Sequence, residues 1–407
     1  MAFSPIKSLA TIAAAVLALS MSACTSSGGP SFSEQVVRSE IARCPDGKWL
    51  DFAGGKLKWN YCAGLELKAF LDVAQVYDLG DVAAYAEAWY DEIIDSSGTP
   101  LGYRQDKYTL DHVCPARTLI PLYKATGKQK YMDAMRLVRE QLRTQPRTAE
   151  GGYWHKAVYP GQIWLDGLYM AEPFLVEYAA AFGTPEDLVQ ASEESMNQFL
   201  TAARVTFDPA TGLYRHAYDS TRGMFWCDPV SGQSAHCWCR ALGWYCMALV
   251  DVFDSVSEGT PGRAEVLEIF RGIVDALPRW ADPESGMWYQ VMDCPGREGN
   301  YLEATGSAMF TYAVLKGVRT GLLDPGLKDY GLSCWQNLLK TFVSTEEEDG
   351  LVTLSRCCSV AGLGGKQNRA GDYAYYLSEP VRDNDPKGIA PLIWAALEIE
   401  KCKNNRK

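Results

Sequence analysis

The chain is poor in the residue patterns on which many common active sites depend. Its 407 residues include only four histidines, and none of them form the His-x-x-x-His or His-Glu-x-x-His spacing of a zinc site. There is also no Cys-x-x-Cys pair, no Gly-x-Ser-x-Gly nucleophile motif and no phosphate-binding loop. The sequence therefore predicts neither a metal site nor a cofactor.

Basic residues are outnumbered as well. Lys and Arg total 39 against 50 Asp and Glu, which gives a formal net charge of −11. Nucleic-acid binding depends on a basic surface, so the composition excludes it as a general function. Apolar residues at 47% and charged residues at 22% are typical of a folded globular chain rather than a disordered one.

Long hydrophobic runs are confined to the N-terminus and are too short to span a bilayer. Residues 1–23 combine Lys7 with an apolar run that ends at small residues before Cys24. This is typical of a bacterial lipoprotein signal peptide, so we expect lipidation at Cys24, a tether over 24–31 and one domain over 32–407. The chain would then be exported to the periplasm or the outer-membrane surface and touch the membrane only through its lipid. A plain cleaved secretory signal is the alternative.

The other twelve cysteines are too sparse for a disulfide scaffold. We interpret most of them as small buried apolar residues, and the sequence leaves open whether a bridge forms.

What the chain does have is helical periodicity, interrupted by glycine. Two turns are close copies, 208–219 and 282–293, each with Asp-Pro-x-x-Gly followed by aromatic residues. We expect about twelve helices, and no convincing series of strands. Their predicted starts lie near residues 32, 64, 81, 109, 128, 165, 185, 241, 263, 303, 327 and 387. This pattern favours an all-α fold in which six hairpins close into an (α/α)6 barrel, and an open helical solenoid is the alternative.

Chemically reactive residues gather at the turns between these helices. All four histidines, His112, His155, His216 and His236, lie there, and Asp111 and Asp166 accompany them. Either aspartate could simply stabilise the start of a helix. In a closed barrel, however, the starts of the inner helices converge on one mouth. Tryptophan, tyrosine, carboxylates and Arg240 at such a mouth are typical of a carbohydrate site, because aromatic faces stack on sugars.

Several strings resemble glycoside hydrolase family 105 over about residues 45–402. They are Leu-Asp-His-Val-Cys-Pro-Ala-Arg at 110–117, Trp-Leu-Asp-Gly-Leu-Tyr-Met-Ala-Glu-Pro-Phe at 164–174 and Trp-Cys-Arg-Ala-Leu-Gly-Trp-Tyr at 238–245. Segments 301–310 and 376–388 extend the match. The resemblance implies an (α/α)6 barrel and an unsaturated rhamnogalacturonyl or glucuronyl hydrolase. Such enzymes add water to the C4=C5 double bond that a lyase leaves on a terminal uronic acid, and the glycosidic bond is then lost indirectly.

The resemblance also assigns roles to residues. It matches Asp166 to the proton donor and water activator, and Asp111 to the second catalytic carboxylate. The substrate-binding residues that it implies are Tyr61, His112, His155, His216, Trp238, Arg240 and Trp244. We expect coupling to Asp111 to keep Asp166 protonated in the complex, against the helix N-terminus that favours its ionised form.

The predicted function is therefore the removal of a Δ4,5-unsaturated uronic acid from pectic oligosaccharides of the rhamnogalacturonan type, by a monomer. Two alternatives remain at this point. One is another (α/α)6 enzyme, a uronate lyase or a sugar epimerase, and the other is a non-catalytic glycan-binding lipoprotein. The sequence does not reveal which sugar follows the uronate.

Overall fold

The computed structural model describes residues 29–48, 50, 55–345 and 348–404. The predicted signal peptide and the predicted lipidation site Cys24 lie outside the described residues. Ser31–Lys407 forms one compact unit, and of the residues before it only Gly29 and Pro30 are described. Within the described part of the chain, every helix is too short or too polar to cross a bilayer.

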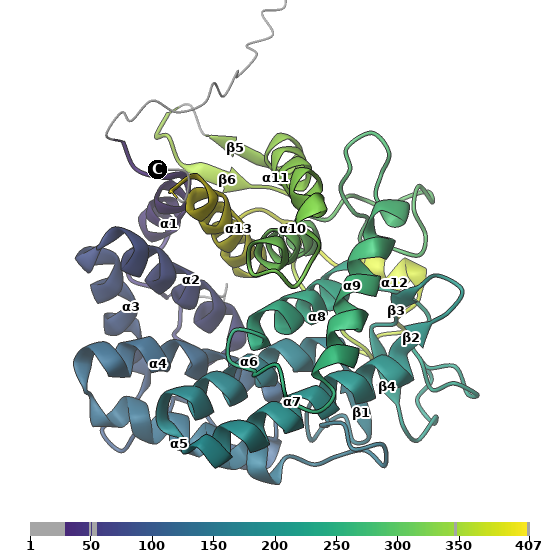
Figure 1. Ribbon diagram of the computed structural model, residues 1–407, viewed down its shortest axis with the longest axis horizontal. Helices are drawn as coiled ribbons and strands as arrows, with labels where there is room; N and C mark the ends of the chain where they lie inside the picture. Colours follow the sequence, from purple (N-terminus) through teal and green to yellow (C-terminus); the bar gives the residue numbers. More distant parts are fainter. Residues whose placement is uncertain (1–28, 49, 51–54, 346–347, 405–407) are drawn as a thin grey trace, which may run out of the picture. The chain divides into compact units, whose positions relative to one another are not determined.

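Six inner helices pack side by side in a closed ring, in which the last is in contact with the first (Figure 1). In ring order these helices are α2 (Tyr61–Tyr77), α4 (Cys114–Thr126), α6 (Leu165–Phe182), α8 (Cys239–Val252), α10 (Ala304–Arg319) and α13 (Pro386–Asn404). Each inner helix also packs against an outer helix. The outer helices are α1 (Phe32–Arg43), α3 (Gly80–Ile93), α5 (Gln129–Thr144), α7 (Pro185–Thr206), α9 (Arg263–Trp280) and α11 (Lys328–Phe342). The predicted (α/α)6 barrel is confirmed, and the open solenoid is excluded because the ring closes.

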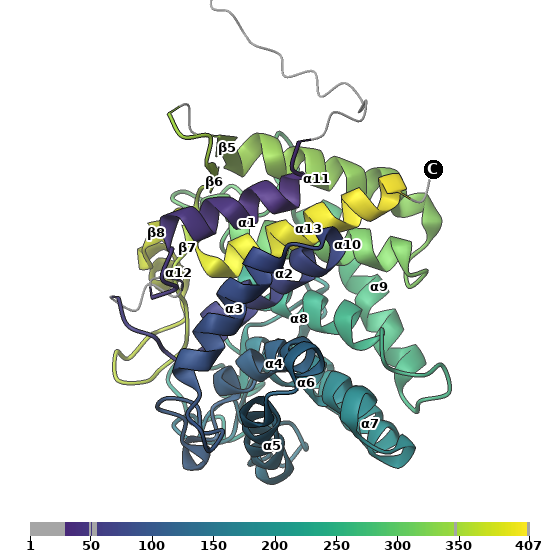
Figure 2. The same ribbon diagram turned by 90° about the vertical axis from the view of Figure 1, so that its left-hand side faces the viewer.

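Burial explains which helices lie inside. Every residue of α8 is buried, which suits a helix with neighbours on all sides. In α5 the buried residues, among them Tyr131, Met135 and Val138, follow a helical repeat along one face. Figure 2 shows α5 and α7 at the periphery and α4 and α6 between them and the centre.

The helices begin close to their predicted positions, with one informative exception. A helix was expected to start near residue 109, but α4 begins at Cys114 and is preceded by a 3₁₀ turn, η2 (Leu110–His112). Pro115 in the first turn of α4 is compatible with a helix start there. Asp111 is consequently carried by a short turn rather than by the helix itself.

Short strands that the sequence did not indicate connect the helices. Each is two or three residues long, so no alternating pattern could develop. They pair antiparallel as β1 (Gln162–Trp164) with β4 (Ala217–Asp219), β2 (Phe207–Asp208) with β3 (Leu213–Tyr214), β5 (Val343–Thr345) with β6 (Val352–Leu354), and β7 (Cys357–Cys358) with β8 (Val381–Arg382). A short helix α12 (Tyr373–Ser378) and the 3₁₀ turns η1 (Gln105–Lys107) and η3 (Pro325–Leu327) complete the connections.

The two similar turns in the sequence adopt the same backbone conformation. Gly212 and Gly286 both have positive φ, 72° and 69°, which a residue with a side chain rarely adopts. Each glycine donates its backbone N–H to the carbonyl of the aspartate four residues earlier, Asp208 or Asp282, at 2.8 and 2.7 Å. The sequence repeat is therefore a repeat of turn structure between successive hairpins.

Candidate active site

A cavity of about 290 Å³ opens where the inner helices begin. Tyr61 and Asp166 lie in the first turns of α2 and α6, and Lys387 lies in the first turn of α13. Helix N-termini leave backbone N–H groups unpaired and carry partial positive charge, which suits an anionic ligand. The cavity is lined by Lys58, Asn60, Tyr61, Cys62, Asp111, His155, Lys156, Tyr159, Trp164, Asp166, Met170, Ser359, Val360, Ala361, Arg369, Arg382 and Lys387.

Asp111 is held between two basic side chains. Its Oδ2 accepts a hydrogen bond from Lys156 Nζ, and its Oδ1 lies 3.6 Å from His155 Nε2. Burial acts to raise the pKa of Asp111, but Lys156 and His155 outweigh it, so the pKa is below its usual value. Asp111 is therefore ionised at neutral pH.

Asp166 has a different partner. Its Oδ2 lies 3.3 Å from His216 Nε2, close enough for an ion pair but not aligned as a hydrogen bond. On the other side of the ring, His216 Nδ1 is 2.8 Å from the hydroxyl of Tyr376, which fixes its orientation. Burial would raise the pKa of Asp166, yet the neighbouring His216 imidazole leaves it lower than usual. His216 thus stabilises the ionised form of Asp166 in the protein without substrate, and its protonation in the complex stays a prediction.

Some of the buried polar atoms without hydrogen-bond partners lie around these two aspartates. Within the described part of the chain, they include His155 Nδ1, Asp166 Oδ2 and His216 Nε2. Buried polar groups in folded proteins nearly always have partners, so an unsatisfied group needs an explanation. Three such atoms beside one cavity are well placed to bond to a ligand or to water.

One wall of the cavity is a stack of three nearly parallel rings. Trp164 lies 4.7 Å from His155 at 12° and 4.8 Å from Tyr159 at 20°, measured between ring centroids and ring planes. His155 is almost fully buried, whereas Tyr159 is partly exposed. The His155 and Tyr159 rings lie side by side against Trp164, with centroids 6.4 Å apart, and this pair leads from Asp111 toward the more exposed part of the cavity. Burial also lowers the pKa of His155 to about 4, so its imidazole is neutral above pH 5.

The residues expected to bind substrate do not all line the cavity. Tyr61 and His155 do, and His216 lies directly behind Asp166. His112 lies outside the lining, with its carbonyl accepting a hydrogen bond from Trp59 Nε1 at 2.9 Å.

The Trp238, Arg240 and Trp244 set lies beneath the cavity rather than on its surface. Each of the three is 1% exposed. Trp244 packs under Tyr61, with ring centroids 6.1 Å apart, and Arg240 lies 4.5 Å from the Trp238 ring and donates to the carbonyl of Cys358. Direct stacking on a sugar or direct pairing with a uronate was expected of them. Of the three, Trp244 supports Tyr61 of the cavity lining, and the expected contacts of the set with a sugar stay a prediction.

Sequence reasoning missed most of the basic residues on the wall. Five cations line the cavity, against the two carboxylates of Asp111 and Asp166. Lys156 directly follows His155, and Arg382 and Lys387 fall within the 376–388 string, so a signal for these three existed. Lys58 and Arg369 belong to no recognised motif.

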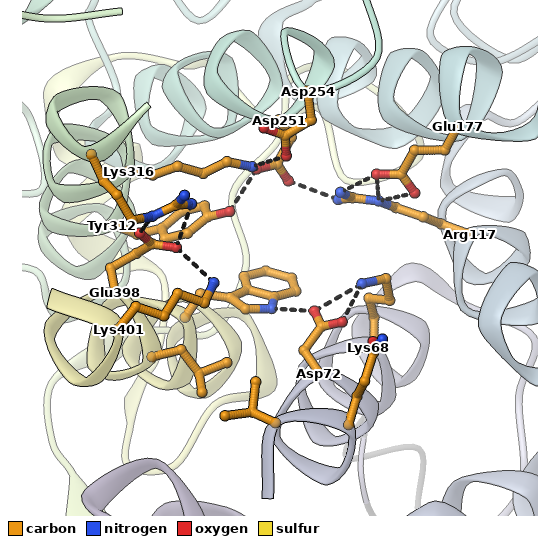
Figure 3. A pocket seen from close by; sticks show the side chains of 15 residues that line it. Lys68, Asp72, Arg117, Glu177, Asp251, Asp254, Tyr312, Lys316, Glu398 and Lys401 are labelled. Atoms are coloured by element: carbon orange, nitrogen blue, oxygen red, sulfur yellow. Dashed lines mark hydrogen bonds and ion pairs between the residues drawn. The ribbon is translucent and has the colours of Figure 1, made fainter. Parts of the chain in front are cut away.

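A second hollow, of about 240 Å³, lies where the inner helices end (Figure 3). Five basic and five acidic side chains line it, and every one of these ten has a partner of opposite charge. Arg117 joins Glu177 of α6 to Asp251 of α8, and Lys316 of α10 also pairs with Asp251. Because its charges are mutually satisfied, we interpret this hollow as a structural network.

His236 belongs to a separate cluster away from the cavity lining. In the part of the chain that the structure describes, His236, Asp293 and Cys294 place possible metal-ligand atoms within 4.8 Å of one another. However, Arg215 Nη1 already donates to Asp293 Oδ2 at 2.9 Å, and a guanidinium at that oxygen opposes a cation there. The cluster is best described as a hydrogen-bonded anchor for the start of the 237–239 segment, since Cys237 N–H also donates to Asp293.

Comparison with known proteins identifies the family. The family model described as Glycosyl Hydrolase Family 88 matches residues 32–403, nearly all of the described chain. The chain belongs to this family. A solved family 105 glycoside hydrolase from C. acetobutylicum ATCC 824 is 38% identical, with a TM-score of 0.86 over 91% of this chain and 100% of that one.

Curated relatives extend this family 88/105 assignment. Protein Atu3128 of Agrobacterium fabrum is 38% identical over 234 residues, 56% of this chain and 97% of the relative. Unsaturated rhamnogalacturonyl hydrolase YesR of Bacillus subtilis is 28% identical over 332 residues, 79% of this chain and 85% of the relative. The protein is thus a glycoside hydrolase of the unsaturated uronyl hydrolase group, which confirms the resemblance to family 105.

Proposed function

We propose that this family 88/105 enzyme removes a Δ4,5-unsaturated uronic acid from the non-reducing end of pectic oligosaccharides of the rhamnogalacturonan type, produced by lyases. The observation that carries the proposal is the cavity itself. It combines two differently partnered carboxylates, a wall of stacked aromatic rings and an excess of cations. The name of the relative YesR supports the choice of rhamnogalacturonan.

In the proposed reaction, Asp166 donates a proton to C4 of the double bond and water adds at C5. The Asp166 carboxylate takes up the proton that the attacking water releases, so the carboxyl group is regenerated. The resulting hemiketal opens and the neighbouring sugar leaves. The glycosidic bond is not attacked directly, and the spacing of the carboxyls therefore does not set an anomeric outcome as it does in ordinary glycosidases.

The ionisation of Asp166 must change for this step. With His216 as neighbour its pKa is lower than usual, which is wrong for an acid catalyst. A bound uronate would bring a further negative charge and exclude water, and both effects favour the protonated form of Asp166. Asp111, paired with Lys156, would stay ionised and accept hydrogen bonds from sugar hydroxyls.

Ultraviolet absorbance tests the proposal, because the conjugated double bond of the substrate absorbs and the product does not. Purified protein added to rhamnogalacturonan digested by a lyase should remove the absorbance, and Asp166→Asn should lower the rate by about 10²–10⁴-fold. Unchanged thermal unfolding of the variant would exclude misfolding. A rise in absorbance would instead indicate a lyase, binding without change would indicate a glycan-binding protein, and full activity of Asp166→Asn would contradict the assigned role.

We also propose that the chain is exported and lipidated at Cys24. The N-terminal pattern of a basic residue, an apolar run and small residues before a cysteine supports this. Expression with labelled palmitate should label the full chain, and Cys24→Ala should remove the label. Labelling that persists in Cys24→Ala would contradict the proposal.

A further inference from the structure

Two of the five cations on the cavity wall have no carboxylate partner among the described residues. Lys156 pairs with Asp111, and Arg382 and Lys387 both pair with Asp385. Lys58 is exposed at the surface, but Arg369 is partly buried on the wall. In a chain with a net charge of −11, an unneutralised guanidinium inside a binding cavity needs an explanation.

Arg369 is held rigidly by neutral groups. Its Nε donates to the carbonyl of Gly364 at 3.1 Å, and its Nη2 donates to the hydroxyl of Tyr159 at 2.8 Å. The backbones of Gly364 and Arg369 also pair with each other, at 2.9 and 3.2 Å, which closes a tight hairpin over 364–369. The guanidinium is therefore positioned before any ligand arrives, which lowers the entropic cost of binding.

The packing around Arg369 leaves no room for it to move inward. A Cβ atom at Gly362 would lie 2.3 Å from its Nη1, so this position accommodates the guanidinium only because it is glycine. Beneath the hairpin, Leu363 is fully buried in a small cluster with Trp164, Ala217 and Trp226. This cluster joins the hairpin to Trp164, the same tryptophan against which His155 and Tyr159 pack. Nη1 has no hydrogen-bond partner among the described residues and remains available to a ligand.

The position of Arg369 relative to the stack indicates which part of a substrate it meets. His155 contacts Asp111, whereas Tyr159, whose ring lies beside that of His155 with centroids 6.4 Å apart, accepts a hydrogen bond from Arg369 at its hydroxyl. The unsaturated ring must lie within reach of Asp111 and Asp166. A group bound at Arg369 therefore belongs to a sugar further along the chain, on the leaving-group side.

We propose that Arg369 is a specificity-determining residue that binds the carboxylate of a second, saturated uronic acid on the leaving-group side of the substrate. This inference rests on the proposed function and makes it more specific. The enzyme would then favour oligosaccharides that carry a further acidic sugar over the shortest unsaturated disaccharide with a neutral neighbour. An arginine suits this role because its N–H groups form charge-assisted hydrogen bonds with carboxylates.

The test compares two substrates by their loss of ultraviolet absorbance. One is the unsaturated uronate linked to rhamnose alone, and the other is the tetrasaccharide that contains one further galacturonate. We expect the wild type to show a KM about tenfold lower for the tetrasaccharide at similar kcat, with the advantage shrinking at high salt. Arg369→Gln should abolish this difference by raising the KM for the tetrasaccharide about tenfold, and Arg369→Lys should retain part of it.

Lys366→Gln is the matched control, because it removes a charge from the same hairpin at an exposed position outside the cavity lining. It should keep the tetrasaccharide preference. Equal KM values for both substrates in the wild type, or a preference that survives in Arg369→Gln, would overturn the inference while the proposed function stands. No turnover of either substrate would overturn the proposed function and the inference with it.

Discussion

Asp111 and Asp166 are both half-buried carboxylates, yet their neighbours give them different properties. Lys156 holds Asp111 as a carboxylate, whereas Asp166 faces an imidazole whose other nitrogen is fixed by Tyr376. A charge fixed by a lysine changes little when substrate enters. A charge that depends on a weakly aligned histidine is easier to neutralise, which suits a group that must alternate between acid and base.

The depressed pKa of His155 predicts a loss of stability in mild acid. Burial lowers its pKa to about 4 in the folded protein, while an unfolded imidazole has a pKa near 6.5. Between these values the unfolded chain binds a proton that the folded chain does not, so the free energy of unfolding falls as pH falls. Urea unfolding of the wild type should lose about 2 kcal/mol more between pH 7 and pH 5 than that of His155→Gln. Equal losses in the two proteins would contradict this prediction.

At this scale the sequence located the two carboxylates of the cavity better than the other residues that line it. Asp166 and Asp111 stand in strings that can be recognised without a structure. Arg369 and Tyr159 do not, because they meet only when the 364–369 hairpin folds against the segment after His155. Trp244 was expected at the surface of the site but is buried, since an aromatic residue in a helical repeat looks the same whether it faces a cavity or a neighbouring helix.

At the scale of the helix, close approach within the inner ring depends on small residues. A Cβ atom at Gly306 of α10 would lie 2.3 Å from Cys239 Sγ and 2.9 Å from the Cys239 carbonyl carbon, at the start of α8. The Cys239 backbone cannot move aside for an added methyl group as a flexible side chain could. Helix positions could be predicted from sequence because apolar periodicity is local, whereas this need for glycine arises from two segments that meet only in the ring.

Two glycine substitutions should therefore have opposite effects on stability. Gly306→Ala should destabilise the protein by about 1–3 kcal/mol, because the added methyl group overpacks the contact between α8 and α10. Gly272→Ala in the outer helix α9 should stabilise it by about 0.5–1 kcal/mol, because its Cβ meets nothing within 4 Å and alanine favours helix. Chemical denaturation measures both. A higher free energy of unfolding for Gly306→Ala would contradict this prediction, because it would show that α8 and α10 can move apart without destabilising the protein.

At the scale of the whole barrel, the two ends of the inner helices have different electrostatics. The end at which the helices begin carries unneutralised cations and unsatisfied polar atoms, whereas the end at which they finish carries a balanced network of ion pairs (Figure 3). The fold therefore places the binding of an anionic ligand at one end of the barrel and the ion pairs that stabilise neighbouring helices at the other end.

This separation predicts that a change at the far end affects stability and not catalysis. Asp251 accepts from Arg117, Lys316 and Tyr312 at 2.6–2.8 Å and is 2% exposed. Asp251→Asn would leave two buried cations short of a partner and should lower the free energy of unfolding by about 3–5 kcal/mol. Asp106→Asn, in a solvent-exposed pair with Arg104, should leave the free energy of unfolding nearly unchanged. At a temperature where each is folded, both should keep wild-type kcat/KM, and a large drop for Asp251→Asn would contradict the separation.

Ring closure has a consequence for how the enzyme acquires activity. Helix α13 lies between α10 and α2, and its Glu400 accepts hydrogen bonds from Ser33, 367 residues earlier in the chain, and from Tyr77. The same helix brings Lys387 into the cavity. Contacts between residues so distant in the chain form late, because a long loop must close before they yield any stabilisation. A growing polypeptide therefore carries five inner helices and an incomplete cavity. It becomes an active enzyme only when the sixth inner helix, α13, closes the ring.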